Sequence, residues 1–169
     1  PEKTSTYIED EFGNGLLYEE DENGDGNIDE RNVATYNDAN QRLTLQQDTN
    51  GDGFWNYSES RTYNDAGDWT FSEVRENEEL KNRWTATYHS EGYMLTATGD
   101  SNGDGIINET YLLNSEGMVL ESTVDSNDDG VIDVRTEFTY NDANQWLTKY
   151  EYYDDDPVID KWEIQTFNE

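Results

Sequence analysis

Polar and apolar residues alternate along most of the chain, in short stretches separated by turns rich in Asn, Asp and Gly. Residues 42–46 (RLTLQ) and 119–122 (VLES) are typical of these stretches. A period of two is that of a β-strand, whereas an amphipathic helix repeats its apolar positions every three or four residues. Thr, Val and aromatic residues are enriched in the stretches, as strands prefer. The pattern therefore predicts an all-β protein with strands of about 6 to 9 residues.

One turn recurs almost unchanged along the chain. It reads Thr-Tyr-Asn-Asp-Ala followed by Asn or Gly, and its copies cover 35–40, 62–67 and 139–144. Weaker copies cover 87–92 and 112–117, and a shortened copy covers 11–15. Self-similarity at a fixed period indicates a repeat protein. An acidic segment follows each copy, so each repeat is expected to hold one β-hairpin and one acidic loop.

The spacing of the acidic segments sets the number of repeats. Four segments begin at Asp21, Asp48, Asp100 and Asp125, and altered copies begin near Arg75 and Tyr152. The chain is thus predicted to form one repeat domain of about six hairpins, approximately 1–29, 30–56, 57–83, 84–108, 109–133 and 134–169. Successive hairpins would build a long twisted or spiral antiparallel meander of about twelve strands, with tight turns along one edge and acidic loops along the other.

The net charge of the chain adds a constraint on its partners. It carries 40 acidic and 10 basic residues, a net charge of −30, with only 32% hydrophobic residues. Such values are typical of disorder, but 12 Tyr, 5 Trp and 5 Phe indicate that some apolar surface is buried. Self-repulsion of this size requires cations. Nucleic acid and anionic membranes are not expected as partners, because both would be repelled.

Four of the acidic segments place oxygen-bearing side chains at alternate positions, as an EF-hand calcium loop does. In that pattern positions 1, 3, 5 and 9 bind through side chains, position 7 through its carbonyl, and Gly at position 6 makes the turn. The first two segments offer Asp21, Asn23, Asp25, Asn27 and Asp29, then Asp48, Asn50, Asp52, Phe54 and Asn56. The last two offer Asp100, Asn102, Asp104, Ile106 and Asn108, then Asp125, Asn127, Asp129, Val131 and Asp133. We therefore predict about four Ca²⁺ sites.

The segments depart from a full EF-hand in two respects. Flanking helices are not predicted, and only the second segment has the bidentate Glu of position 12, as Glu59. Glu30, Glu109, Glu137 or a neighbouring loop are alternative sources of that ligand. The expected affinity is therefore that of extracellular modules, about 10⁻⁴ to 10⁻³ M. Position 8 is apolar each time and is expected to anchor the loop to the core; the residues are Ile28, Trp55, Ile107 and Ile132.

Other interpretations of the acidic segments remain open. Asn, Asp and Gly favour turns in any case, so the segments could be plain turns without metal. The copies near Arg75 and Tyr152 lack most of the pattern and are not expected to bind metal, and Arg75 is expected to supply a positive charge of its own. The chain has no Cys and one His, which argues against zinc or copper. Magnesium fits less well than calcium because it dehydrates reluctantly.

The stretch at 35–44 resembles the YD repeat of bacterial Rhs-type and teneurin-like proteins, as do 62–70 and 139–148. The resemblance implies long β-hairpins that wind into a spiral sheet, either in shells that encapsulate toxins or in adhesion proteins. It therefore implies an extracellular or bacterial cell-surface scaffold. The calcium-like loops are a departure from that family.

These observations favour a calcium-binding structural or adhesion module of a larger secreted or surface protein, and not an enzyme. Near-equivalent repeats offer no singular pocket, and the lone His89 lies in a turn. A protein or glycan at the cell surface is the expected partner. The alternatives are a carbohydrate-binding module that uses exposed Trp and Tyr, or a part of a toxin shell. The Trp side chains are expected instead to form the core of a thin sheet, where large side chains must supply the burial. No apolar run is long enough to insert in a membrane, and Pro1 begins no visible signal peptide.

Overall fold

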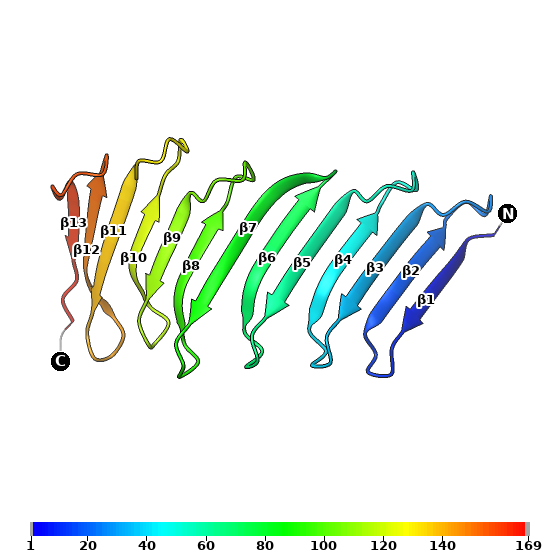
Figure 1. The fold of residues 1–169 in the computed structure, drawn as a ribbon, viewed down its shortest axis with the longest axis horizontal. Helices are drawn as coiled ribbons and strands as arrows, with labels where there is room; N and C mark the ends of the chain where they lie inside the picture. Colours follow the sequence, from blue (N-terminus) through cyan, green and yellow to red (C-terminus); the bar gives the residue numbers. More distant parts are fainter. Residues whose placement is uncertain (1, 168–169) are drawn as a thin grey trace. The chain divides into compact units, whose positions relative to one another are not determined.

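The computed structural model describes residues 2–167, and within that range it contains thirteen β-strands and no helix (Figure 1). The first seven are β1 (Thr4–Glu9), β2 (Gly15–Asp21), β3 (Glu30–Tyr36), β4 (Arg42–Asp48), β5 (Tyr57–Tyr63), β6 (Trp69–Glu76) and β7 (Glu79–Tyr88). The others are β8 (Met94–Asp100), β9 (Glu109–Leu113), β10 (Val119–Val124), β11 (Val134–Tyr140), β12 (Trp146–Tyr153) and β13 (Lys161–Ile164).

The strands pair in the order in which they occur in the sequence, and neighbouring strands run antiparallel. The predicted all-β class and the order of hairpins are therefore confirmed. About twelve strands were expected, and β13 is the additional one. The described residues hold no helical segment long and apolar enough to cross a bilayer.

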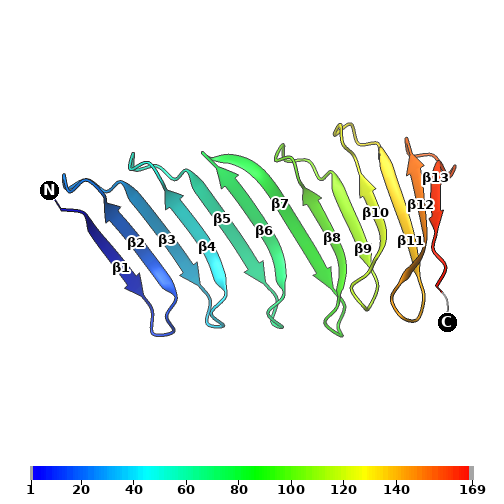
Figure 2. The same ribbon diagram turned by 180° about the vertical axis from the view of Figure 1, so that it is seen from behind.

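The chain divides into two compact units, one up to Arg83 and one from Trp84 onward, so that β7 contributes to both. Within each unit the tight turns lie along one edge of the sheet and the acidic loops along the opposite edge, as Figure 2 shows from the reverse side. This is the arrangement that an unbroken succession of hairpins imposes, because alternate connections must fall at alternate ends of the strands.

The recurrent turn is held by its Asn. The side-chain oxygen of Asn37 accepts hydrogen bonds from the N–H groups of Ala39 at 3.0 Å and Gln41 at 2.9 Å, and Asn64 and Asn141 repeat these bonds. The last residue of the motif has a positive φ, which Asn and Gly adopt at the lowest steric cost. These two requirements explain why the motif is conserved among the copies within this chain.

The Tyr of the same motif connects neighbouring hairpins. The Tyr63 hydroxyl donates to the carbonyl of Arg42 at 3.1 Å, and the Tyr140 hydroxyl donates to the carbonyl of Val119 at 2.7 Å. Each bond runs from one repeat to the preceding one within the same unit. Stability therefore comes from contacts between adjacent repeats, as in other repeat proteins.

Little apolar surface is fully buried. Among the described residues the buried apolar side chains are Ala34, Ala86 and Tyr152. Four of the five Trp residues are half-buried, and Trp162 is 62% exposed. The expected position-8 anchors fail at Ile28 and Ile107, which are 38% and 60% exposed. No second layer covers either face of the sheet in the described residues, so side chains on the loops have no core to reach.

Candidate metal-binding loops

The four acidic segments form loops between consecutive strands. Loop 1 (residues 21–29) joins β2 to β3, loop 2 (48–56) joins β4 to β5, loop 3 (100–108) joins β8 to β9, and loop 4 (125–133) joins β10 to β11. In each unit they lie along the edge opposite the tight turns (Figure 1). Asp21, Asp48 and Asp100 are the last residues of their strands, and Asp125 directly follows β10, where its N–H donates to the carbonyl of Asn108 at 2.9 Å.

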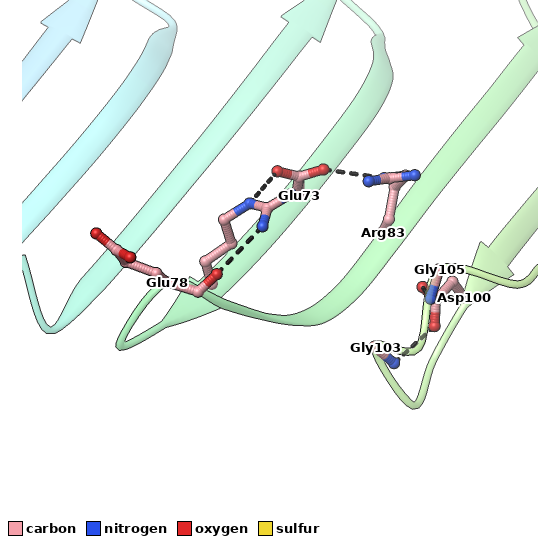
Figure 3. A network of polar contacts seen from close by, with 7 residues as sticks. Glu73, Glu78, Arg83, Asp100, Gly103 and Gly105 are labelled. Atoms are coloured by element: carbon pink, nitrogen blue, oxygen red, sulfur yellow. Dashed lines mark hydrogen bonds and ion pairs between the residues drawn. The ribbon is translucent and has the colours of Figure 1, made fainter.

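The first Asp of each loop is among the most buried residues of the protein. Asp21, Asp48, Asp100 and Asp125 are 5%, 5%, 2% and 4% exposed. In loop 3 the two carboxylate oxygens of Asp100 accept hydrogen bonds from the N–H groups of Gly103 at 2.6 Å and Gly105 at 2.8 Å (Figure 3). The corresponding bonds recur in loops 1 and 2. The loop backbone thus wraps around a buried carboxylate.

The remaining side chains of the pattern hold the loop in the same way in all four copies. The side-chain oxygen of the Asn at position 3 accepts a hydrogen bond from the backbone N–H of position 5. The carboxylate of the Asp at position 5 accepts a hydrogen bond from the backbone N–H of position 7, at 2.8 Å in each loop. The side chain of position 9 accepts the N–H of position 2. In loop 4 the hydroxyl of Ser126 also donates to Asp133 and holds the pKa of that carboxyl below its usual value.

The hydrogen bonds do not use all the lone pairs of the loop carboxylates. An ionised carboxylate has about four lone-pair sites, so an Asp that accepts one or two N–H groups retains sites for a cation. The bonds described above fix the loop conformation without metal. They are therefore compatible with both interpretations of the sequence, the calcium loop and the plain turn.

The two altered copies behave differently. Near Arg75 the strands β6 and β7 are joined by a two-residue turn, Asn77 and Glu78, both with positive φ. Arg75 pairs with Glu73 at 2.6 Å and donates to the carbonyl of Glu78 at 3.2 Å (Figure 3). The salt bridge expected of Arg75 is present, with Glu73 of β6 as its partner, and its role as a substitute for a metal ion stays a prediction.

The altered copy near Tyr152 keeps two hydrogen bonds of the loops without the first Asp, but its backbone differs: Asp154 and Asp155, at positions 3 and 4, have a positive φ, whereas loops 1 to 4 have it at positions 4 and 6. Asp160 accepts the N–H of Tyr153 at 2.8 Å, and Asp156 accepts the N–H of Val158 at 2.7 Å. These are the bonds of positions 9 and 5. The hydrogen bonds of positions 5 and 9 therefore form without the buried Asp of position 1, although the backbone takes a different path.

The cations of the protein are distributed unevenly. All ten Lys and Arg residues lie in the described part of the chain, and each forms an ion pair with a glutamate. Within residues 2–167 none of them pairs with an aspartate. The loop carboxylates, which are mostly aspartates, are thus left without a positive partner from the protein.

The glutamates named as position-12 ligands lie on the strands and already have partners. Glu59 on β5 is 6% exposed and pairs with Arg42 at 2.7 Å and with Arg61. Its Oε1 accepts no well-aligned hydrogen bond, although the Arg61 guanidinium lies against it. Glu30 accepts a hydrogen bond from the side-chain amide of Asn32, and Glu109 accepts one from the hydroxyl of Tyr111. Glu137 forms an ion pair with Arg135. Within residues 2–167 Glu59 forms no group of three acidic side chains with those of loop 2, and its role as the ligand of position 12 stays a prediction.

The acidic side chains of the loops do not form a ready-made cluster. Within residues 2–167 no three Asp, Glu, His or Cys side chains converge as in a ready-made metal site. An open cleft of about 690 Å³ does lie between loops 1 and 2; its lining residues are Glu20, Glu22, Asn23, Asp29, Glu30, Thr49 and Asn50. Glu22 was not identified from the sequence, because it occupies position 2 of the pattern, where no ligand is expected.

Comparison with known proteins assigns the chain to no family. The resemblance to YD repeats rests on residues 35–44, 62–70 and 139–148 and stays a prediction. No protein-family model matches the chain, and no curated protein sequence matches it significantly.

Proposed function

We propose that the chain is a calcium-binding structural module of an extracellular or bacterial surface protein, in which Ca²⁺ ions neutralise the acidic loops and rigidify one edge of each unit. The proposal is carried by the distribution of charge. The glutamates of the strands use all ten basic side chains, while the buried aspartates of the loops have none.

The physical argument concerns what can compensate these carboxylates. Removing an ionised carboxylate from water costs several kcal/mol unless it is paired or hydrogen-bonded. The N–H groups of the loops supply part of the compensation, and the rest must come from solution. A hard divalent cation suits sites made of carboxylate, amide and carbonyl oxygens, and Ca²⁺ tolerates their irregular geometry.

The proposed ligands are the oxygens of positions 1, 3, 5, 7 and 9 of loops 1 to 4. Glu59 is not among them, because two arginines already compensate its charge. With few carboxylates per loop and no bidentate Glu, the affinity should be weak, about 10⁻⁴ to 10⁻³ M, which suits extracellular Ca²⁺. A rigid, charge-compensated row of loops fits a scaffold or adhesion role and needs no catalytic group.

Calorimetric titration with CaCl₂, combined with thermal unfolding in Ca²⁺ and in EDTA, tests this proposal. Each occupied site should add about 2.7 kcal/mol to the free energy of unfolding when the ion is at a hundredfold excess over its dissociation constant. The Tm should therefore rise steeply with Ca²⁺ and fall in EDTA. A chain with the same Tm in both, and no heat of binding, would not be a calcium module.

Single-charge variants assign the sites. Asp25→Asn and Asp52→Asn remove the charge of position 5 in loops 1 and 2 but keep an oxygen that can accept the bonded N–H. Each should weaken or abolish one binding event. Asp38→Asn is the matched control, because Asp38 is an exposed residue in a tight turn at the opposite edge. Equal effects from all three variants would mean that Ca²⁺ responds only to net charge.

A further inference from the structure

Loop 4 differs from the other loops at position 4. Loops 1 to 3 have Gly there, and its N–H donates to the first Asp; the residues are Gly24, Gly51 and Gly103, at 2.6, 2.9 and 2.6 Å. Loop 4 has Asp128 instead, with a φ of 58°. Backbone in this left-handed region is unfavourable for a residue with a side chain, although Asp tolerates it better than most.

This difference leaves a buried oxygen without a partner. Asp125 is only 4% exposed, yet its Oδ1 has no hydrogen-bond partner. Its Oδ2 still accepts the N–H of Gly130 at 2.8 Å. A buried carboxylate oxygen without a donor is costly, and loops 1 to 3 avoid that cost through their glycine N–H. The backbone N–H of Asp128 makes no such bond, so the Oδ1 of Asp125 is left uncompensated in loop 4.

The side chain of Asp128 reaches the neighbouring loop. Its Oδ2 accepts a hydrogen bond from the side-chain amide of Asn102 in loop 3 at 2.6 Å, and its Oδ1 is buried without a partner. Desolvation raises the pKa of Asp128 above its ordinary value, against the lowering effect of the hydrogen bond from Asn102. The charge of Asp104, a side-chain hydrogen bond with Asp104 and the charge of Asp125 raise the pKa further. Two loops thus meet through carboxylates that repel one another.

We propose that a divalent cation, with Ca²⁺ as the best match, binds between loops 3 and 4 and joins the two repeats through Asp104, Asp125 and Asp128. The inference rests on the proposed function, but it differs in placing an ion between loops and in assigning a ligand, Asp128, outside the EF-hand pattern. The uncompensated oxygens of Asp125 and Asp128 are the groups that the cation would satisfy.

The chemistry of the group fits such an ion. Three carboxylates provide hard oxygen ligands, and rotation of the Asn102 amide would add its oxygen as a fourth. These side chains do not surround one point in the described structure, so binding requires them to rotate inward. Repulsion between carboxylates in the metal-free form opposes that movement, and the charge of the cation removes the repulsion.

Asp128→Gly is the decisive variant, because it restores the residue of the other three loops. In EDTA it should unfold at a higher temperature than the unchanged chain, since it removes the repulsion and the strain of a side chain at positive φ. In Ca²⁺ it should bind one ion fewer by calorimetry. Asp128→Asn, which keeps the shape and the acceptor but loses the charge, should also lose that ion.

The outcomes separate this inference from the proposed function. If Asp128→Gly and Asp128→Asn bind Ca²⁺ with unchanged number and affinity while Asp25→Asn and Asp52→Asn do not, the bridging site is wrong and the loop sites stand. If only the Asp128 variants lose an ion, the bridging site stands and the sites within loops 1 and 2 are wrong. If the unchanged chain binds no Ca²⁺, both proposals are overturned.

Discussion

The indole ring of Trp84 on β7 lies against the backbone of Gly99 on β8, so closely that a Cβ atom on Gly99 would come within 2.5 Å of ring atoms. The same ring lies 6.0 Å from that of Tyr111, between centroids. Gly is unfavourable inside a strand because it packs nothing and loses much entropy. Here the aromatic ring occupies the space that a side chain would take, and it covers the strand at the start of loop 3.

The variant Gly99→Ala should therefore destabilise the protein. The new methyl group cannot fit beneath the indole unless the ring or the strand moves, and overpacking of this kind costs about 1 to 3 kcal/mol. Urea unfolding measures the change in the free energy of unfolding. Combining it with Trp84→Leu should make Gly99→Ala nearly neutral, because the smaller side chain leaves room. If the two effects simply add, the contact is not what requires Gly99.

Gly51 should be less tolerant of substitution than Gly53 in the same loop. Both have a positive φ, 68° and 86°. A Cβ on Gly51 would lie 2.5 Å from the carbonyl oxygen of Ile28 in loop 1, whereas a Cβ on Gly53 would meet nothing within 4 Å. Gly53→Ala should cost about 1 kcal/mol for its backbone conformation alone. Gly51→Ala should cost clearly more, and equal losses in denaturant unfolding would contradict a packed contact between loops 1 and 2.

Glu59→Gln should lower stability and leave calcium binding unchanged. The substitution removes the charge that Arg42 and Arg61 share, and breaking an ion pair at a site 6% exposed should cost about 1 to 3 kcal/mol, since both arginines remain partly solvated. Denaturant unfolding measures the loss, and CaCl₂ titration of the folded protein measures binding. A weaker calcium affinity in this variant would restore Glu59 as the position-12 ligand of loop 2.

The sequence was sufficient for the fold because the turns carry strong local signals. The Asn of the recurrent turn, illustrated by Asn37, fixes each hairpin through its own backbone, and the alternating stretches on either side have strand length. The position of the apolar residues was less predictable. Ile107 was expected to face a core, but a single sheet offers the loop no apolar layer to enter.

The candidate site was predictable in its residues and not in its contacts. The repeated spacing identified Asp100 and its equivalents, which the structure places among the most buried side chains. It could not show that Glu59 is held by Arg42, which is distant in sequence, as well as by Arg61, nor that Asp128 approaches loop 3. Both depend on how neighbouring strands align, which the spacing within one loop does not encode. The only signal for Asp128 was that it replaces a glycine found in the other three loops.

The acid stability of the second unit should depend on Glu151. Lys149, Tyr153 and Lys161 surround this carboxylate and lower its pKa from 4.5 to about 2, the first through the strongest contact. A lowered pKa means that the folded state holds the proton less tightly than the unfolded state does, so folding is favoured while the group is ionised. That stabilisation is complete above about pH 4.5 to 5, and it is lost as the pH falls toward 2.

Glu151→Gln isolates this contribution. The variant should unfold at a lower temperature than the unchanged chain at pH 6, and the difference should shrink between pH 4.5 and 2, where the native carboxylate becomes protonated. Because Lys161 is half-exposed, the contribution should not exceed about 1 kcal/mol. Lys81 and Glu79 form an exposed pair in the other unit, and Glu79→Gln should leave the pH profile almost unchanged. A Tm difference for Glu151→Gln that stays constant from pH 6 to pH 2 would mean that the charge of Glu151 contributes nothing, and that only its packing is lost.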